Sequence, residues 1–149
     1  AEARTVAANL LIDGGELAVT DHRYVPHAVF TEPQIAAVGA TEEQLQGWGT
    51  PYVEFKQRYA DVAFGWALED EGHFVKLLAD PRTWHLLGAH IIGPQAATLI
   101  QPMIQAMSFG QTVQELARGQ YWIHPALTEV LENALLGLLK APRPKELDA

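Results

Sequence analysis

Cysteine is absent from the 149 residues of this chain. The absence excludes disulfide bonds, thiolate metal sites and any thiol nucleophile that the chain itself would supply. Disulfide-free composition is usual where thiols are kept reduced, so it is compatible with a cytoplasmic location, which is our expectation.

Positive charge and long apolar runs are also scarce. Ten Lys and Arg residues stand against 18 Asp and Glu residues, which gives a formal net charge of −8. A surface with this charge repels phosphate backbones and anionic lipid headgroups, so we expect neither nucleic acid nor membranes as partners. No apolar run approaches the roughly 20 residues that a membrane-spanning helix needs.

The strand-like segments are short and follow one another along the middle of the chain. Residues 28–40 contain two extended pieces separated by a proline, and residues 52–59 alternate between apolar and polar side chains. Two further strands, 72–80 and 83–93, are joined by a turn that contains aspartate and proline, so they predict a β-hairpin.

Helical patterns lie mainly on either side of these strands. Thr41 and Gln44 have the spacing of a capping box, and Pro102 is expected to kink or divide the helix that contains it. Because strands and helices are segregated, the sequence predicts an α+β fold, an antiparallel β-sheet meander with helices packed against it. The predicted helices are 1–12, 41–48, 96–110, 112–119 and about 125–139.

The segment YWIHPALTEV places His124 before Pro125 and five residues ahead of Glu129. Proline suits the first turn of a helix, so one interpretation makes His124 a residue that precedes the last helix and packs there. In the other interpretation, the imidazole folds back onto the Glu129 carboxylate, which orients the ring for general acid–base work. The residues alone leave both interpretations open.

Longer segments resemble the FAD-dependent pyridine nucleotide–disulfide oxidoreductases, and in particular the C-terminal dimerisation domain of that family. The resemblance covers residues 20–138. It rests on the His-Pro…Glu spacing within GQYWIHPALTEVLENALLGL and on the segments VFTEPQIAAVGATEEQ, DVAFGWALEDEG and LLGAHIIGPQAATLIQPMIQAMSFG.

The resemblance implies a role for the His-Pro…Glu motif only within a longer parent enzyme. There His124 would reach across a twofold axis as the acid–base partner of a redox cysteine pair, and Glu129 would orient it. The backbone of His124 and Pro125 would border the partner's flavin. The parent would use FAD and NADPH to reduce the disulfide of a small thiol.

Two features of such parents are missing from this chain. It contains no Gly-x-Gly-x-x-Gly dinucleotide fingerprint and no redox cysteine pair. We therefore expect the chain by itself to be inactive and to bind neither FAD nor NADPH. The expected division is a helix left from the preceding FAD-binding domain at 1–15, the dimerisation domain at 16–139 and a C-terminal tail at 140–149.

A metal site is not expected, and a homodimer is. The other histidines include two pairs spaced five apart, which on a strand would point to opposite faces. Apolar helix surface around Leu99–Met107 and Val130–Leu139 exceeds what one small sheet readily covers, so it predicts a twofold contact. The alternative function is a free-standing dimeric binding or scaffold module, in which His124 is only a packing residue.

Overall fold

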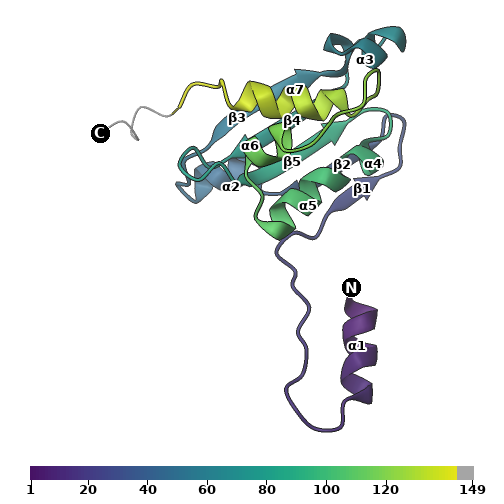
Figure 1. The fold of residues 1–149 in the computed structure, drawn as a ribbon, viewed down its shortest axis with the longest axis vertical. Coiled ribbons are helices and arrows are strands. Elements are labelled where there is room, and N and C mark those ends of the chain that lie inside the picture. The colour runs from purple at the N-terminus through teal and green to yellow at the C-terminus, as the bar shows by residue number, and fades with distance from the viewer. Residues whose placement is uncertain (144–149) are drawn as a thin grey trace.

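A computed structural model describes residues 1–143. Its centre is an antiparallel sheet in the order β1-β2-β5-β4-β3 (Figure 1). The α+β fold predicted from the sequence is confirmed. The strands are β1 His27–Val29, β2 Ile35–Gly39, β3 Val53–Arg58, β4 Phe74–Ala79 and β5 Leu86–Ile92.

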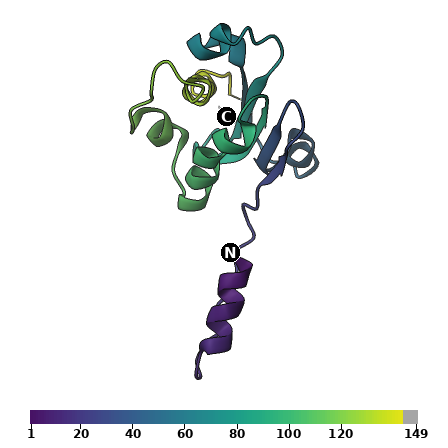
Figure 2. The same cartoon turned by 90° about the vertical axis from the view of Figure 1, so that its right-hand side faces the viewer.

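Helices are distributed unequally over the two faces of this sheet. Figure 2 shows α5, α6 and α7 on one side and the short α2 on the other. The helices are α1 Glu2–Leu11, α2 Glu42–Gly47, α3 Ala63–Ala67, α4 Ala96–Leu99, α5 Gln101–Phe109, α6 Val113–Arg118 and α7 Glu129–Leu138, with a 3₁₀ turn η1 at Tyr59–Asp61.

The hairpin between β4 and β5 forms as predicted, although β4 and β5 begin two and three residues later than expected. Asp80 Oδ1 accepts a hydrogen bond of 2.7 Å from the backbone N–H of Arg82, which closes the turn. Trp84 has φ +60° and lies in the turn rather than in a strand. A left-handed backbone conformation is incompatible with an extended strand, so β5 begins only at Leu86.

Two local features that the sequence predicts for the helices are also confirmed. Thr41 and Gln44 form the predicted capping box at the start of α2. The run 96–110 is divided into α4 and α5, and Pro102 lies in the first turn of α5, where its missing N–H costs no helical hydrogen bond.

The apolar faces of α5 and α7 pack on their own sheet. From α5, Met103 and Ala106 are fully buried, and α7 buries one continuous side against β3 and β4. The interpretation of Leu99–Met107 and Val130–Leu139 as surplus surface for a second subunit is therefore wrong. Their buried residues belong to the core of one chain, because the covered face of the sheet is large enough to take both helices.

Sequence patterns missed one helix and misplaced the start of another. The segment η1–α3 was not predicted, because five residues are too few for a helical period to be recognisable. The last helix begins at Glu129 and not at Pro125, and residues 124–128 form bends and turns before it.

The N-terminal segment stands away from the sheet and its helices (Figure 1). No residue of α1 is buried. Its contacts are local, with Asn9 bonded to the backbone of Ala18 and Thr5 to Thr20. The predicted division at residue 15 stays a prediction, and the body of the fold begins near β1.

The predicted C-terminal tail begins with residues that return to the core. Ala141 packs against the core cluster, and the Arg143 guanidinium lies 5.1 Å from the centre of the Trp84 ring. Residues 144–149 of the tail lie outside the described residues. Across residues 1–143, every helix is too short or too polar to cross a membrane.

Candidate active site

A loop between α6 and α7 carries His124, and its own side chains hold it in place. Trp122 donates from Nε1 to the carbonyl of Ala117 at 3.1 Å, and Gln120 donates to the carbonyl of Leu116 at 3.1 Å. Leu127 is buried in the core. The loop is thus anchored on both sides of His124, which limits the positions that its backbone can take.

The imidazole of His124 meets the carboxylate of Glu129. The Nδ1–Oε1 distance is 2.7 Å, and the second carboxylate oxygen accepts the backbone N–H of Ala126 at 3.2 Å. The side chain of Glu129 is 16% exposed and that of His124 is 69% exposed. The folded-back contact, one of the two interpretations of the sequence, is present, and it leaves the far side of the ring facing outwards.

The electrostatics of this pair follow from the same contacts. The hydrogen bond from His124, together with that from Ala126, holds the pKa of Glu129 below its ordinary value of 4.5. An ionised carboxylate only accepts hydrogen bonds, so the shared proton is assigned to Nδ1 of His124. In the neutral ring, Nε2 is then the unprotonated nitrogen, and it lies on the side of the ring away from the bond to Glu129.

The late start of α7 corrects part of the reasoning about His124. Pro125 does not occupy the first helical turn, and it follows His124 through a cis peptide bond. Glu129, in contrast, is the first residue of α7. The positive end of the helix dipole therefore acts on the Glu129 carboxylate, where it favours the ionised form.

Two other histidines pair with carboxylates elsewhere in the chain. His73 Nδ1 contacts Asp70 Oδ2, a pair that the sequence analysis missed although Asp-x-x-His spacing signals it. His22 Nε2 lies 2.8 Å from Glu2 Oε1. No group of three potential ligands able to hold a metal occurs among residues 1–143.

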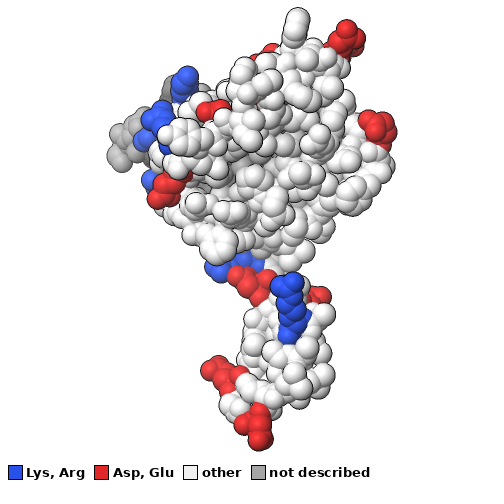
Figure 3. Space-filling view, turned by 45° about the vertical axis from the view of Figure 1, so that its right-hand side comes forward, with Lys and Arg blue, Asp and Glu red and all other residues white. Residues whose placement is uncertain are grey.

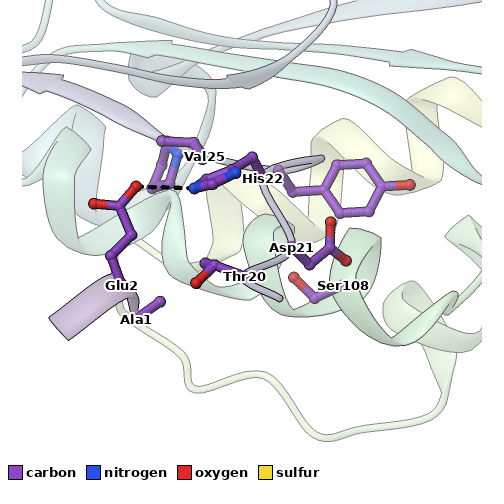
Figure 4. A pocket seen from close by; sticks show the side chains of 9 residues that line it. Ala1, Glu2, Thr20, Asp21, His22, Val25 and Ser108 are labelled. Carbon is purple, nitrogen blue, oxygen red and sulfur yellow. Dashed lines mark hydrogen bonds and ion pairs between the residues drawn. The ribbon is translucent and has the colours of Figure 1, made fainter. Parts of the chain in front are cut away.

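Two cavities of the chain are lined by residues other than His124. One of about 540 Å³ opens between the start of α1 and the segment after it, and Figure 4 shows His22 bonded to Glu2 beside Thr20 and Ser108. Another of about 710 Å³ lies over β2 and α2. Neither is lined by His124, whose side chain is 69% exposed and projects from the surface of the chain.

The chain is similar to a known protein family and to several of its members. Residues 25–135 match the family model described as "Pyridine nucleotide-disulphide oxidoreductase, dimerisation domain". The mycothione reductase of Mycobacterium tuberculosis (strain ATCC 25618 / H37Rv) is 61% identical over 140 residues, which are 92% of this chain and 30% of that protein. The dihydrolipoyl dehydrogenase of Mycobacterium leprae (strain TN) is 36% identical over 140 residues, 93% of this chain and 30% of that protein.

Solved structures agree with the sequence relatives. The HOCl-induced flavoprotein disulfide reductase RclA from Escherichia coli has a TM-score of 0.80 at 26% identity, over 89% of this chain and 30% of that chain. LpdA from Mycobacterium tuberculosis has a TM-score of 0.75 at 27% identity, over 83% of this chain and 27% of that chain. This chain thus spans 30% of the length of the curated relatives above. With the family model, the relatives and the fold in agreement, the chain belongs to the pyridine nucleotide-disulphide oxidoreductases, as their dimerisation domain.

Proposed function

We propose that this chain serves as the dimerisation domain of a longer NADPH- and FAD-dependent reductase of a low-molecular-weight disulfide of the mycothione type. In that enzyme it supplies His124 and Glu129 to the active site of the partner subunit. The observation that carries the proposal is the geometry of this pair. Glu129 is held by two hydrogen bonds, while the His124 ring that it orients is 69% exposed.

The chemistry of the pair suits thiol–disulfide exchange. Nε2 of His124 accepts the proton of a cysteine thiol, which leaves the thiolate that attacks a disulfide sulfur. The imidazolium formed in this step is stabilised by the Glu129 carboxylate, which is ionised because its pKa is lowered. The same ring then returns the proton to the thiolate that leaves.

The chain has no cysteine, so the proton acceptor and the thiol must come together from different parts of a larger assembly. His124 projects outwards beside exposed Tyr121 and Ile123. Figure 3 shows a broad face of the body without charged side chains, and depletion of charge is typical of the centre of subunit interfaces. These features support a homodimer in which each subunit completes the site of the other.

The flavin contact assigned to this chain is limited to the backbone of its loop. Among residues 1–143, no hydrogen bond ends on the carbonyls of residues 121–125, so those of His124 and Pro125 remain available as acceptors for a flavin edge. A bound flavin would relay the electrons of a hydride to the cysteine pair. No glycine-rich phosphate turn occurs in the sequence, so other parts of the enzyme would hold the pyrophosphate of FAD and the NADPH.

Hybrid dimers test the contribution in trans. A His124→Ala subunit of the full-length enzyme is co-expressed with a subunit that lacks the redox cysteines. If the histidine acts across the interface, randomly mixed subunits regain about a quarter of wild-type disulfide turnover, because half the dimers are hybrids and each has one complete site.

The two parental homodimers serve as controls, and both should be nearly inactive. Hybrids without activity, despite confirmed exchange of subunits, would place the histidine and the cysteines in one subunit. A His124→Ala homodimer with full activity would leave the scaffold function as the better explanation.

A further inference from the structure

The loop that carries His124 exposes two apolar side chains beside the imidazole. Tyr121 is fully exposed, and Ile123 is 74% exposed. Trp122 between them turns the other way, packs against the core and donates to the carbonyl of Ala117. The loop is therefore held by Trp122 and by buried Leu127, while Tyr121 and Ile123 contribute nothing to its anchoring.

Both residues lie close to His124 along the chain. Ile123 is adjacent to His124, and an extended chain places the Cα of Tyr121 within about 10 Å of that of His124. The disulfide bound at the partner's cysteines must come within hydrogen-bond distance of the His124 ring. The parts of that disulfide next to its sulfur atoms then lie against this loop.

The chemistry of the loop restricts what it recognises. The segment between Gly119 and Thr128 contains no Lys, Arg, Asp or Glu. Recognition of carboxylate-bearing arms requires cationic donors, most effectively arginine. Tyr121 instead offers an aromatic face and a hydroxyl group, and Ile123 offers an aliphatic surface, which together suit an uncharged moiety with C–H and hydroxyl groups.

We propose that Tyr121 and Ile123 are specificity-determining residues, which contact an uncharged arm of the disulfide bound in the partner subunit. The inference rests on the proposed function of His124 and adds the part of the substrate that this chain reads. Loss of these contacts weakens binding of the arm and leaves the proton transfer by His124 intact.

The test compares two disulfides in the full-length enzyme. One is mycothione, the disulfide in the name of the 61% identical relative, and the other is 2-hydroxyethyl disulfide, which has almost no arms beyond its sulfur atoms. We expect Tyr121→Ala and Ile123→Ala each to lower kcat/KM for mycothione by about 10- to 100-fold, mainly through KM. Turnover of 2-hydroxyethyl disulfide should stay within about twofold of wild type, with an unchanged pH profile of kcat.

The matched control is Phe109→Ala, which removes an exposed aromatic side chain at the end of α5 and should alter neither reaction. Equal losses with both disulfides would overturn the proposal and make the two residues positioning residues for His124. Dissociation of the variants into monomers would assign them to the subunit contact. His124→Ala separates this question from the proposed function, because it should abolish turnover of both disulfides, and its retention of both would refute the role of the histidine itself.

Discussion

Two histidine–carboxylate pairs in this chain share their chemistry and differ in their surroundings. His73 follows α3 and pairs with Asp70, whose side chain is 3% exposed, and the edge of its ring meets Tyr59 at 6.1 Å between centroids. His124 pairs with Glu129 from a projecting loop. The exposed fraction of the ring is 29% for His73 and 69% for His124.

The difference shows why a short contact between imidazole and carboxylate does not by itself define a catalytic pair. Asp70 also accepts the backbone N–H groups of Gly72 and His73, so the first pair closes a turn between α3 and β4. Gly93 packs against the His73 ring, and a Cβ there would lie 2.6 Å from the His73 Cβ. The ring of His73 is part of the packing, whereas that of His124 projects from the surface of the chain.

The largest expected effect is on disulfide turnover, which should fall when His124 is replaced and change little when His73 is replaced. In the full-length enzyme, His124→Ala should lower disulfide turnover by about 10²–10⁴, the usual contribution of one positioned general acid–base. His73→Ala should change kcat by less than about threefold at a temperature where the fold is intact. Steady-state kinetics of disulfide reduction measure both, and comparable losses in the two variants would mean that the exposure of the ring does not distinguish a catalytic pair from a structural one.

Replacement of the carboxylate should have a smaller effect than loss of the ring. Glu129→Gln keeps a side chain of the same shape and leaves the imidazole in place, while it removes the negative charge that stabilises the imidazolium. We expect turnover to fall by about 10- to 100-fold. A loss larger than that of His124→Ala would indicate that Glu129 acts on the reaction independently of the histidine.

The effects on stability should have the opposite order, with a larger loss of unfolding free energy for His73→Ala than for His124→Ala. His73→Ala deprives the buried Asp70 carboxylate of one partner and should lower the free energy of unfolding by about 1–3 kcal/mol. His124→Ala breaks a pair whose ring is mostly exposed and should cost less than about 1 kcal/mol. Urea denaturation of the chain followed by circular dichroism gives both values.

The exposed pair of His22 and Glu2 supplies the control for that ranking. Both side chains are mostly exposed, at 60% and 76%, so His22→Ala should alter the free energy of unfolding by less than about 0.5 kcal/mol. A larger effect would mean that α1 contributes to the stability of the body.

The smallest expected effect is the change at low pH in the stability that Glu129 contributes. The pKa of Glu129 is lower in the folded chain than its ordinary value of 4.5, chiefly because His124 donates a hydrogen bond to it. A lowered folded pKa contributes stability that is fully present above that ordinary value and is lost as the pH falls through the folded pKa. The difference in unfolding free energy between wild type and Glu129→Gln should therefore shrink below about pH 4.5. Denaturation curves from pH 7 to 3.5 test this, and a difference that grows in acid would contradict it.

Signals that act over a few residues were read correctly from the sequence. The capping box at Thr41, the turn at Asp80 and the break at Pro102 each depend on neighbours within one turn of chain, so their outcome hardly depends on the rest of the fold. The start of α7 depends on a local bond and also on a contact with the rest of the fold. Burial of Leu127 and the bond from Ala126 to Glu129 hold residues 125–128 outside the helix, although proline suits a first helical turn.

The sequence by itself determined the α+β class, the absence of thiol and dinucleotide-binding elements, and the spacing that lets His124 meet Glu129. Only the tertiary structure decided which apolar surfaces are used internally. An apolar helix face has the same pattern whether its own sheet or a second subunit covers it, and the packing of distant segments selects between them. That packing buries Met103 and Leu135 in one chain, and in the loop before α7 it takes Trp122 and Leu127 into contact with the core while Tyr121 and Ile123 stay exposed.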